Sequence, residues 1–226
     1  MSAARYLRVA GEIARKDLVL ELRSKRVLST AVVFALLVVV TFAFSFAKSF
    51  TDLAAVGHGA LWISFVFAGT LSVTQSGELE SRDGAVDGLM LVPVDRSAIY
   101  VGKVASNTAF VAGVELLTLA FVSIFLGYTP PTAALPTLSG VVVLASLGFS
   151  AVGVVLSMLT AKSQVRELLL PALLIPLTVP VLLAGVELTR ALAGDGVPGQ
   201  WLRLLVAYDG ILFLAGLMTF EYVLEE

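Results

Sequence analysis

Two carboxylates lie inside apolar runs of the sequence and are the first candidates for chemistry. Glu115 and Asp209 are each flanked by long hydrophobic stretches. An ionised group at membrane depth costs about 3 kcal/mol or more, so such residues face a bundle interior and by default mark a functional site. The alternative is a structural role, in which each carboxyl is protonated or hydrogen-bonded to a hydroxyl such as Thr118 or Ser123. Both interpretations stay open for these intramembrane polar residues.

His58 is the only histidine of the chain. Imidazole is a common metal and haem ligand, which makes His58 a weak candidate for a haem contact. The alternative is a polar residue at the outer end of a membrane span. Neither Met158 nor Met218 is placed to form an axial pair with it. Because the sequence has no cysteine, we expect no thiolate metal site and no haem attachment motif, and we predict no metal centre.

The longest polar interruption between the apolar blocks runs from Gln75 to Lys103 and is rich in acidic residues. Glu80, Asp83 and Asp87 recur at helical spacing, which predicts a short amphipathic helix with these carboxylates on one face. Glycines weaken this helix, a proline ends it, and Asp95 is placed to cap the next one. We predict that residues 75–100 form a coupling loop through which a partner ATPase moves this chain; the alternative is a solvated connector. The candidate coupling residues are Glu78, Glu80, Asp83, Gly84, Asp87, Gly88, Pro93, Asp95 and Arg96, joined by Lys16, Asp17 and Glu21 from the N-terminal segment.

The composition places these residues in a membrane protein. Hydrophobic residues make up 58% and charged residues only 14% of the chain, against about a quarter charged in soluble proteins. A spanning helix needs about 20 mostly apolar residues, and strands are excluded because the runs lack the alternation of a barrel. We predict an all-α membrane protein with six transmembrane helices, near Val27 to Ala47, Gly59 to Thr74, Val101 to Leu126, Leu135 to Leu159, Leu168 to Leu188 and Trp201 to Leu224. No cleavable signal is expected, because the first run is long enough to span.

The distribution of lysine and arginine predicts the orientation. With the N-terminus inside, twelve of these residues lie on the cytoplasmic side and three, Lys48, Arg190 and Arg203, lie outside. The positive-inside rule therefore places both termini and the coupling loop in the cytoplasm. Three prolines at positions 171, 176 and 180 predict a kink or a break in the fifth span.

Residues 1–26 mix seven basic residues with regularly spaced apolar ones. This pattern is typical of an amphipathic helix at the cytoplasmic surface of the membrane; the alternative is a solvated basic tail. The six-helix transmembrane domain then comprises residues 27–226. The chain lacks the phosphate loop G-x-x-x-x-G-K-[ST] and hydrolase motifs, so it is not expected to be an enzyme, and any ATP is hydrolysed by another subunit.

Three segments carry a resemblance to a known family. They are LWISFVFAGTLSVTQSGELESRDGAVDGLMLVPVDRSAIYVGK at residues 61–103, KDLVLELRSK at residues 16–25 and FEYVLEE at residues 220–226. The chain resembles the CcmB family, the ABC-2-type permease subunits of the haem-exporter ABC system in cytochrome c maturation. Arg82 departs from the pattern, in which a second acidic residue precedes Asp83.

The resemblance implies a permease in the prokaryotic cytoplasmic (inner) membrane that forms a homodimer and binds a CcmA-like ATPase. It also implies a CcmC-like haem-handling protein and a CcmE-like haem chaperone as partners. No cofactor is then bound by this chain: ATP and Mg²⁺ belong to the ATPase, and haem is a candidate cargo. Nucleic acid is not expected as a partner. The permease either carries haem or transmits ATP energy to release the loaded chaperone, and the poor haem pocket favours the second role.

Three other interpretations remain open on the sequence. The chain could export another substrate, such as a lipid, a polysaccharide or a drug, as an ABC-2-type permease. It could be a non-transporting membrane assembly scaffold. It could also be an ion or proton carrier built on Glu115 and Asp209, which would need no ATPase.

Overall fold

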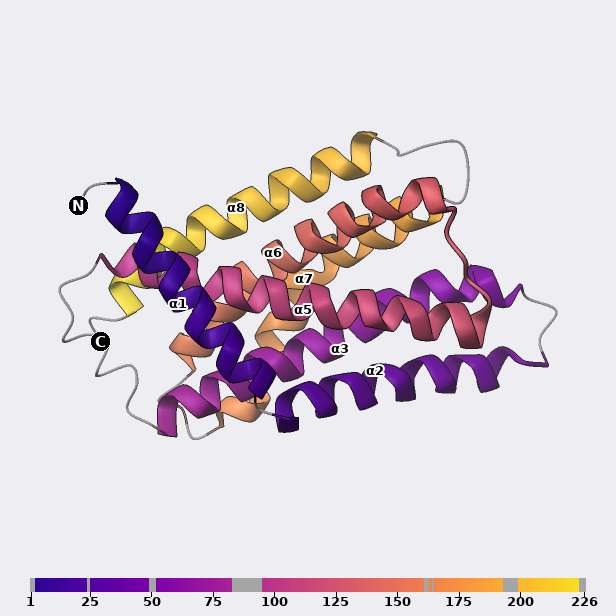
Figure 1. The fold of residues 1–226 in the computed structure, drawn as a ribbon, viewed down its shortest axis with the longest axis horizontal. Helices are drawn as coiled ribbons and strands as arrows, with labels where there is room; N and C mark the ends of the chain where they lie inside the picture. The colour runs from indigo at the N-terminus through magenta and orange to yellow at the C-terminus, as the bar shows by residue number, and fades with distance from the viewer. Residues whose placement is uncertain are drawn as a thin grey trace.

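The computed structural model describes residues 3–23, 25–48, 52–82, 95–160, 163, 165–192 and 199–223. Within these residues the chain forms seven α-helices, one 3-10 turn and no strand. Six helices run roughly along one long axis, and the first crosses the bundle obliquely (Figure 1). The elements are α1 (Ala3–Arg23), α2 (Lys25–Phe46), α3 (Leu53–Arg82), α5 (Arg96–Leu126), η1 (Thr132–Ala134), α6 (Leu135–Leu159), α7 (Arg166–Ala191) and α8 (Gly199–Val223).

All six predicted spans are confirmed as helices long and apolar enough to cross a membrane. They cover Val27–Phe46, Leu53–Thr74, Arg96–Leu126, Thr132–Leu159, Leu168–Ala191 and Gly199–Phe220. The second begins six residues before its predicted start at Gly59, and its helix continues to Arg82. Helical backbone satisfies its own hydrogen bonds, which is the condition for crossing lipid.

Of the predicted kink or break in the fifth span, the break does not occur in α7. It runs as one helix from Arg166 to Ala191 past all three of its prolines. Each proline removes one backbone donor, but neighbouring helices pack against α7 and hold it: the hydroxyl of Tyr208 donates to the Leu177 carbonyl at 2.9 Å. Tertiary packing therefore keeps the segment helical.

α6 is the central helix of the bundle. In its most apolar stretch 72% of the residues are buried, against 22% in α2 and 17% in α8. The outer faces of α2, α7 and α8 carry exposed large apolar side chains, among them Leu37, Phe44, Leu183 and Met218. Such faces suit contact with lipid, which is as apolar as these side chains.

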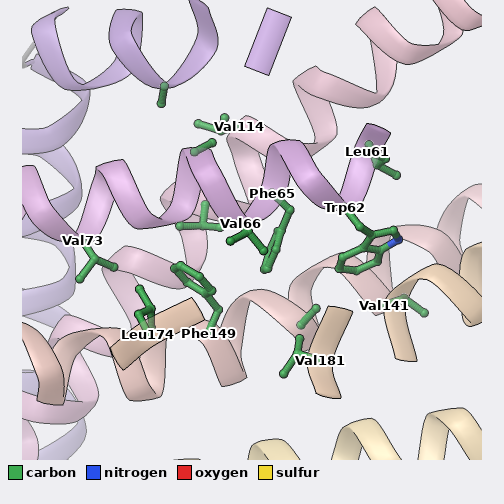
Figure 2. Close-up of a cluster of buried hydrophobic side chains, with 14 of the residues drawn as sticks. Leu61, Trp62, Phe65, Val66, Val73, Val114, Val141, Phe149, Leu174 and Val181 are labelled. Atoms are coloured by element: carbon green, nitrogen blue, oxygen red, sulfur yellow. The ribbon is translucent and has the colours of Figure 1, made fainter. Parts of the chain in front are cut away.

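The main core cluster fills the space between α3, α5, α6 and α7, with further residues from α2 and α8 (Figure 2). Phe65 and Phe149 meet with ring centroids 5.3 Å apart in an edge-on arrangement, a favoured geometry for aromatic pairs. Trp62 is 1% exposed and its indole N–H donates to the Thr189 hydroxyl at 3.1 Å. The indole ring lies so close to the backbone at Gly185 that a Cβ there would overlap it. These contacts fix α3 against α6 and α7.

The first and the last described helix have their outer ends at the same end of the bundle. α1 begins and α8 ends on the left in Figure 1, where α3 also ends and α5 begins. We call this the α1 end. The placement agrees with an even number of spans, which returns the chain to the side on which it started.

Candidate functional site

Two of the candidate coupling residues, Asp95 and Arg96, lie at the α1 end, where α5 starts at a well-formed cap. Asp95 is the N-cap of α5, and its carboxylate accepts from the Ser97 backbone N–H at 3.1 Å and from the Ser97 hydroxyl at 2.6 Å. The hydroxyl and then the backbone N–H of Ser97 lower the pKa of Asp95 below its usual 3.8. The predicted cap is confirmed. A cap of this kind stabilises the start of a helix by about 1 kcal/mol.

α1 packs along the first turns of α5 through a glycine contact. A Cβ on Gly102 would lie 2.7 Å from the Ala10 carbonyl oxygen and 2.8 Å from the Ile13 Cβ. Ile13 joins a second buried cluster with Ile99, Tyr100, Val104, Ala151, Val154, Val155 and Phe220. The absence of a side chain at residue 102 is therefore what lets the two helices approach closely.

A buried ion pair joins the same two helices. The Lys103 ammonium lies 3.6 Å from the Asp17 carboxylate, and the two side chains are only 5% and 12% exposed. Glu21 lies one turn further along the same face of α1 and is buried. Lys16 also contacts Asp17, at 2.5 Å, but is about half exposed. Two of the three N-terminal candidates thus face α5, and Lys16 is the one that a partner could reach.

Tyr100, near the start of α5, connects the contact between α1 and α5 to α6 and α8. Its hydroxyl donates to the Ala151 carbonyl at 3.1 Å, and the Phe213 carbonyl lies 3.4 Å away. Its ring lies 5.3 Å from that of Phe220. Gly216 leaves room for the hydroxyl. A displacement of the start of α5 would therefore change its contacts with α1, α6 and α8 at the same time.

Much of the coupling loop lies outside the described residues. Glu78 and Glu80 lie on the helical continuation of α3, which ends at Arg82, and their side chains are not described. Asp83, Gly84, Asp87, Gly88 and Pro93 lie outside the described residues. The prediction that these residues form a docking helix stays a prediction. Arg96 opens α5 immediately after the cap.

Glu115 and Asp209 both face the bundle interior, as expected from their cost at membrane depth. Each is 1% exposed. Neither carboxyl has a hydrogen-bond partner within the described part of the chain. The hydroxyls proposed as partners are used elsewhere: Thr118 donates to the Val114 carbonyl and Ser123 to the Leu119 carbonyl, each at 2.8 Å.

Asp209 occupies a tight place between α8 and α6. Its carboxyl lies against the backbone of Gly148, at a position where a Cβ on residue 148 would overlap it. A buried polar group without a partner costs about 1–3 kcal/mol. The bundle therefore holds two carboxyls whose presence opposes stability, which is the usual sign of a residue kept for function.

His58 is enclosed at the opposite end of the bundle. It is 6% exposed, its Nδ1 lies 3.3 Å from the Ala55 carbonyl, and its ring centroid is 4.4 Å from that of Tyr128. Its Nε2 is buried as well. A haem ligand needs an open nitrogen, so this conformation does not offer His58 as one. Among the described residues, no three histidine, aspartate or glutamate side chains group into a metal site.

Comparison with known proteins identifies the family. The profile of the family described as CcmB protein matches residues 8–221, all but the two ends of the chain. The chain belongs to the CcmB family. It is 30% identical over 175 residues to heme exporter protein B of Rhodobacter capsulatus, an alignment that covers 77% of this chain and 79% of that protein. The family match spans all six membrane helices and α1 from residue 8 onward.

Sequence reasoning missed three residues that build the site of this CcmB-family protein. Tyr100, Gly102 and Lys103 were noted within the family-like run, but no role was predicted for them. Lys103 counts as a positive-inside residue in the sequence, and only the packing of α1 reveals Asp17 as its partner. A glycine followed by a lysine at the start of a membrane span was the available signal.

Proposed function

We propose that this chain is the membrane permease subunit of a haem-exporter ABC system that works in cytochrome c maturation. The observation that carries the proposal is the family match over residues 8–221, which covers a bundle of the predicted six-span form. The relative in Rhodobacter capsulatus is named a heme exporter protein. The excess of basic residues at the α1 end supports a cytoplasmic placement of both termini, in the inner membrane of a prokaryote.

In this proposal the energy comes from a separate ATPase subunit of the CcmA kind, which binds ATP and Mg²⁺. It docks at the α1 end, on the acidic loop between α3 and α5. The cap at Asp95 joins that loop to α5, and α5 is joined to α1 through Gly102 and Lys103. A push on the loop then moves α1 and α5 as one body.

The complex would contain two copies of this chain, a CcmC-like haem-handling protein and a CcmE-like haem chaperone. Haem is cargo of the system and not a cofactor resident in this chain. The enclosed position of His58 favours transmission of ATP energy over haem ligation by this residue. The permease acts, in this proposal, by changing the conformation of its partners when ATP is hydrolysed.

The experiment is a purification of the chain from its native membrane in mild detergent, with identification of the bound proteins and measurement of their ATPase rate. We expect a CcmA-like ATPase and a CcmC-like protein. We also expect that substitution of Asp83 and Asp87 by asparagine lowers the coupled ATPase rate and the amount of haem-stained c-type cytochrome in cells. Glu187→Gln, at the other end of the bundle, is the matched control.

Each alternative function gives a different result. Recovery of an ATPase without haem-handling partners would indicate an exporter of another substrate. If the ATPase rate of the bound partners is unchanged by the loop substitutions, the chain is an assembly scaffold. Recovery of no ATPase would contradict the proposal and favour a carrier that works through Glu115 and Asp209.

A further inference from the structure

We infer that the outward face of α1 binds the headgroups of anionic phospholipids in the leaflet at the α1 end. The inference goes beyond the proposed function, because it concerns the lipid around the permease and not the ATPase. It rests on three observations: the side of α1 that packs on α5, the side chains on the opposite side, and the place of α1 beside the bundle.

The packing against α5 fixes which side of α1 is inward. Ala10, Ile13 and Glu21 are buried, and Asp17 reaches the buried Lys103. These four residues recur at three and four positions, so they form one continuous face. Gly102 on α5 brings that face into close contact. α1 therefore cannot rotate about its axis without breaking the ion pair and the glycine contact.

The opposite side of α1 is basic. Arg5, Arg8, Arg15, Lys16 and Arg23 are exposed, and Glu12 is the one acidic side chain exposed among them in the described helix. Large apolar side chains flank this basic face: Leu7 is 68%, Leu20 54% and Leu22 51% exposed. A helix with basic and exposed apolar side chains together is suited to the boundary between headgroups and acyl chains.

The position of α1 turns this face toward lipid. Figure 1 shows α1 across the near side of the bundle, in front of the first part of α5, and not beyond the end of the bundle. The side away from α5 therefore looks sideways, out of the bundle. α1 ends at Arg23 and the first span begins at Val27. The C-terminal end of α1 thus lies at the level where a span enters the membrane, and long basic side chains on this face can extend toward the phosphates.

Charge complementarity favours an anionic lipid over a zwitterionic one. A basic side chain near an anionic membrane surface strengthens binding by about fivefold. Removal of three such side chains should therefore weaken the interaction by about a hundredfold if their effects add. On the inward face, Asp17 is paired with Lys103 within the protein and opposes this attraction little.

The test uses the purified full chain in mild detergent without any partner, so its outcome does not depend on the proposed function. Phosphatidylglycerol or phosphatidylcholine is added, and bound lipid is counted by native mass spectrometry. The test variant is Arg8→Gln with Arg15→Gln and Arg23→Gln. The control variant also removes three exposed basic charges, at the far end of the bundle: Lys48→Gln with Arg190→Gln and Arg203→Gln. Thermal unfolding midpoints verify that both variants fold.

We expect the wild type and the control to prefer phosphatidylglycerol and the test variant to lose that preference. The wild-type preference should also fall as salt is raised from 0.05 M toward 1 M, in line with screening over about 3 Å at the higher value. The inference is overturned if the test variant keeps the preference, if both variants lose it equally, or if inorganic phosphate competes as well as the lipid does. The inference is also overturned, in favour of a protein-docking surface, if the test variant keeps its lipid preference but no longer retains the ATPase when it is purified from native membranes.

Discussion

The bundle buries charge in two contrasting ways. At the α1 end, Lys103 and Asp17 neutralise each other across the α1 to α5 contact. Deeper in the bundle, Glu115 and Asp209 have no partner in the described part of the chain. A buried pair whose one member is lost leaves an uncompensated charge, whereas a lone carboxyl can become neutral by binding a proton. The ion pair holds two helices together. The lone carboxyls can bind a proton, or can gain a partner if the conformation changes.

The largest effect is expected where the pair is broken. Lys103→Met removes the buried one of the two ammonium groups that contact Asp17 and leaves only that of the half-exposed Lys16. We expect a loss of about 3 kcal/mol in folding free energy, concentrated in the attachment of α1. Thermal unfolding in mild detergent and limited proteolysis of α1 measure it. Lys16→Gln, which removes a half-exposed neighbour of Asp17, should change stability little.

A charge exchange sharpens this result. Lys103→Asp combined with Asp17→Lys should recover part of the stability that Lys103→Asp alone loses, because the attraction is restored with reversed polarity. If the double variant is no more stable than the single one, the ion pair does not hold α1. The close contact at Gly102 would then be the main attachment.

The close contact of Gly102 with α1 can be tested by adding one methyl group at residue 102. Gly102→Ala places a Cβ against a backbone oxygen of α1, so we expect a loss of about 1–3 kcal/mol and a looser α1. Gly113 lies on the same helix with nothing within 4 Å of its Cβ position. Gly113→Ala should be neutral or gain up to about 1 kcal/mol from helix propensity. Equal effects of the two substitutions would contradict a close packing of α1 on α5.

A smaller effect is expected at the helix cap. Asp95→Ala should cost about 1 kcal/mol, and Asp95→Asn should cost less because asparagine also caps. The hydrogen bonds from Ser97 lower the pKa of Asp95, so its stabilisation is complete at pH values above 3.8 and is lost as the pH falls through the lowered pKa. The difference in unfolding midpoint between wild type and Asp95→Ala should therefore shrink only below about pH 4. A difference that vanishes already at pH 6 would show that Asp95 is not the group responsible.

The sequence predicted the parts of this fold that depend on local physics. Six apolar runs long enough to span became six helices, and an aspartate before a polar turn became the cap of α5. Of the predicted kink or break at the three prolines, the break does not occur: α7 runs as one helix past all of them. Intrinsic helix propensity describes an isolated segment, and tertiary packing can override it.

The candidate site was predicted less completely, because it depends on which helix faces which. The sequence gives the face on which Asp17 and Glu21 lie but not the lysine, some 85 residues later, that Asp17 meets. It also identifies Glu115 and Asp209 as costly without showing that Thr118 and Ser123 bond to their own helix. Which side chains of different helices contact each other depends on tertiary packing, and the spacing of residues along one helix does not reveal it.

The smallest effect on stability is expected at the unpartnered carboxyls, and this outcome completes the comparison. Glu115→Gln and Asp209→Asn keep the shape of the side chain and remove the ability to carry a charge, so the unfolding midpoint should stay the same or rise. Haem-stained c-type cytochrome in cells should nevertheless fall, because a residue retained at a cost to stability is retained for function. Glu187→Gln, which alters only a partly exposed pair with Arg190, should change neither quantity. If the two amide variants instead unfold as readily as Lys103→Met while Glu187→Gln does not, the intramembrane carboxyls hold the bundle together through contacts that their ionised form requires. The two ways of burying charge would then serve the same structural purpose.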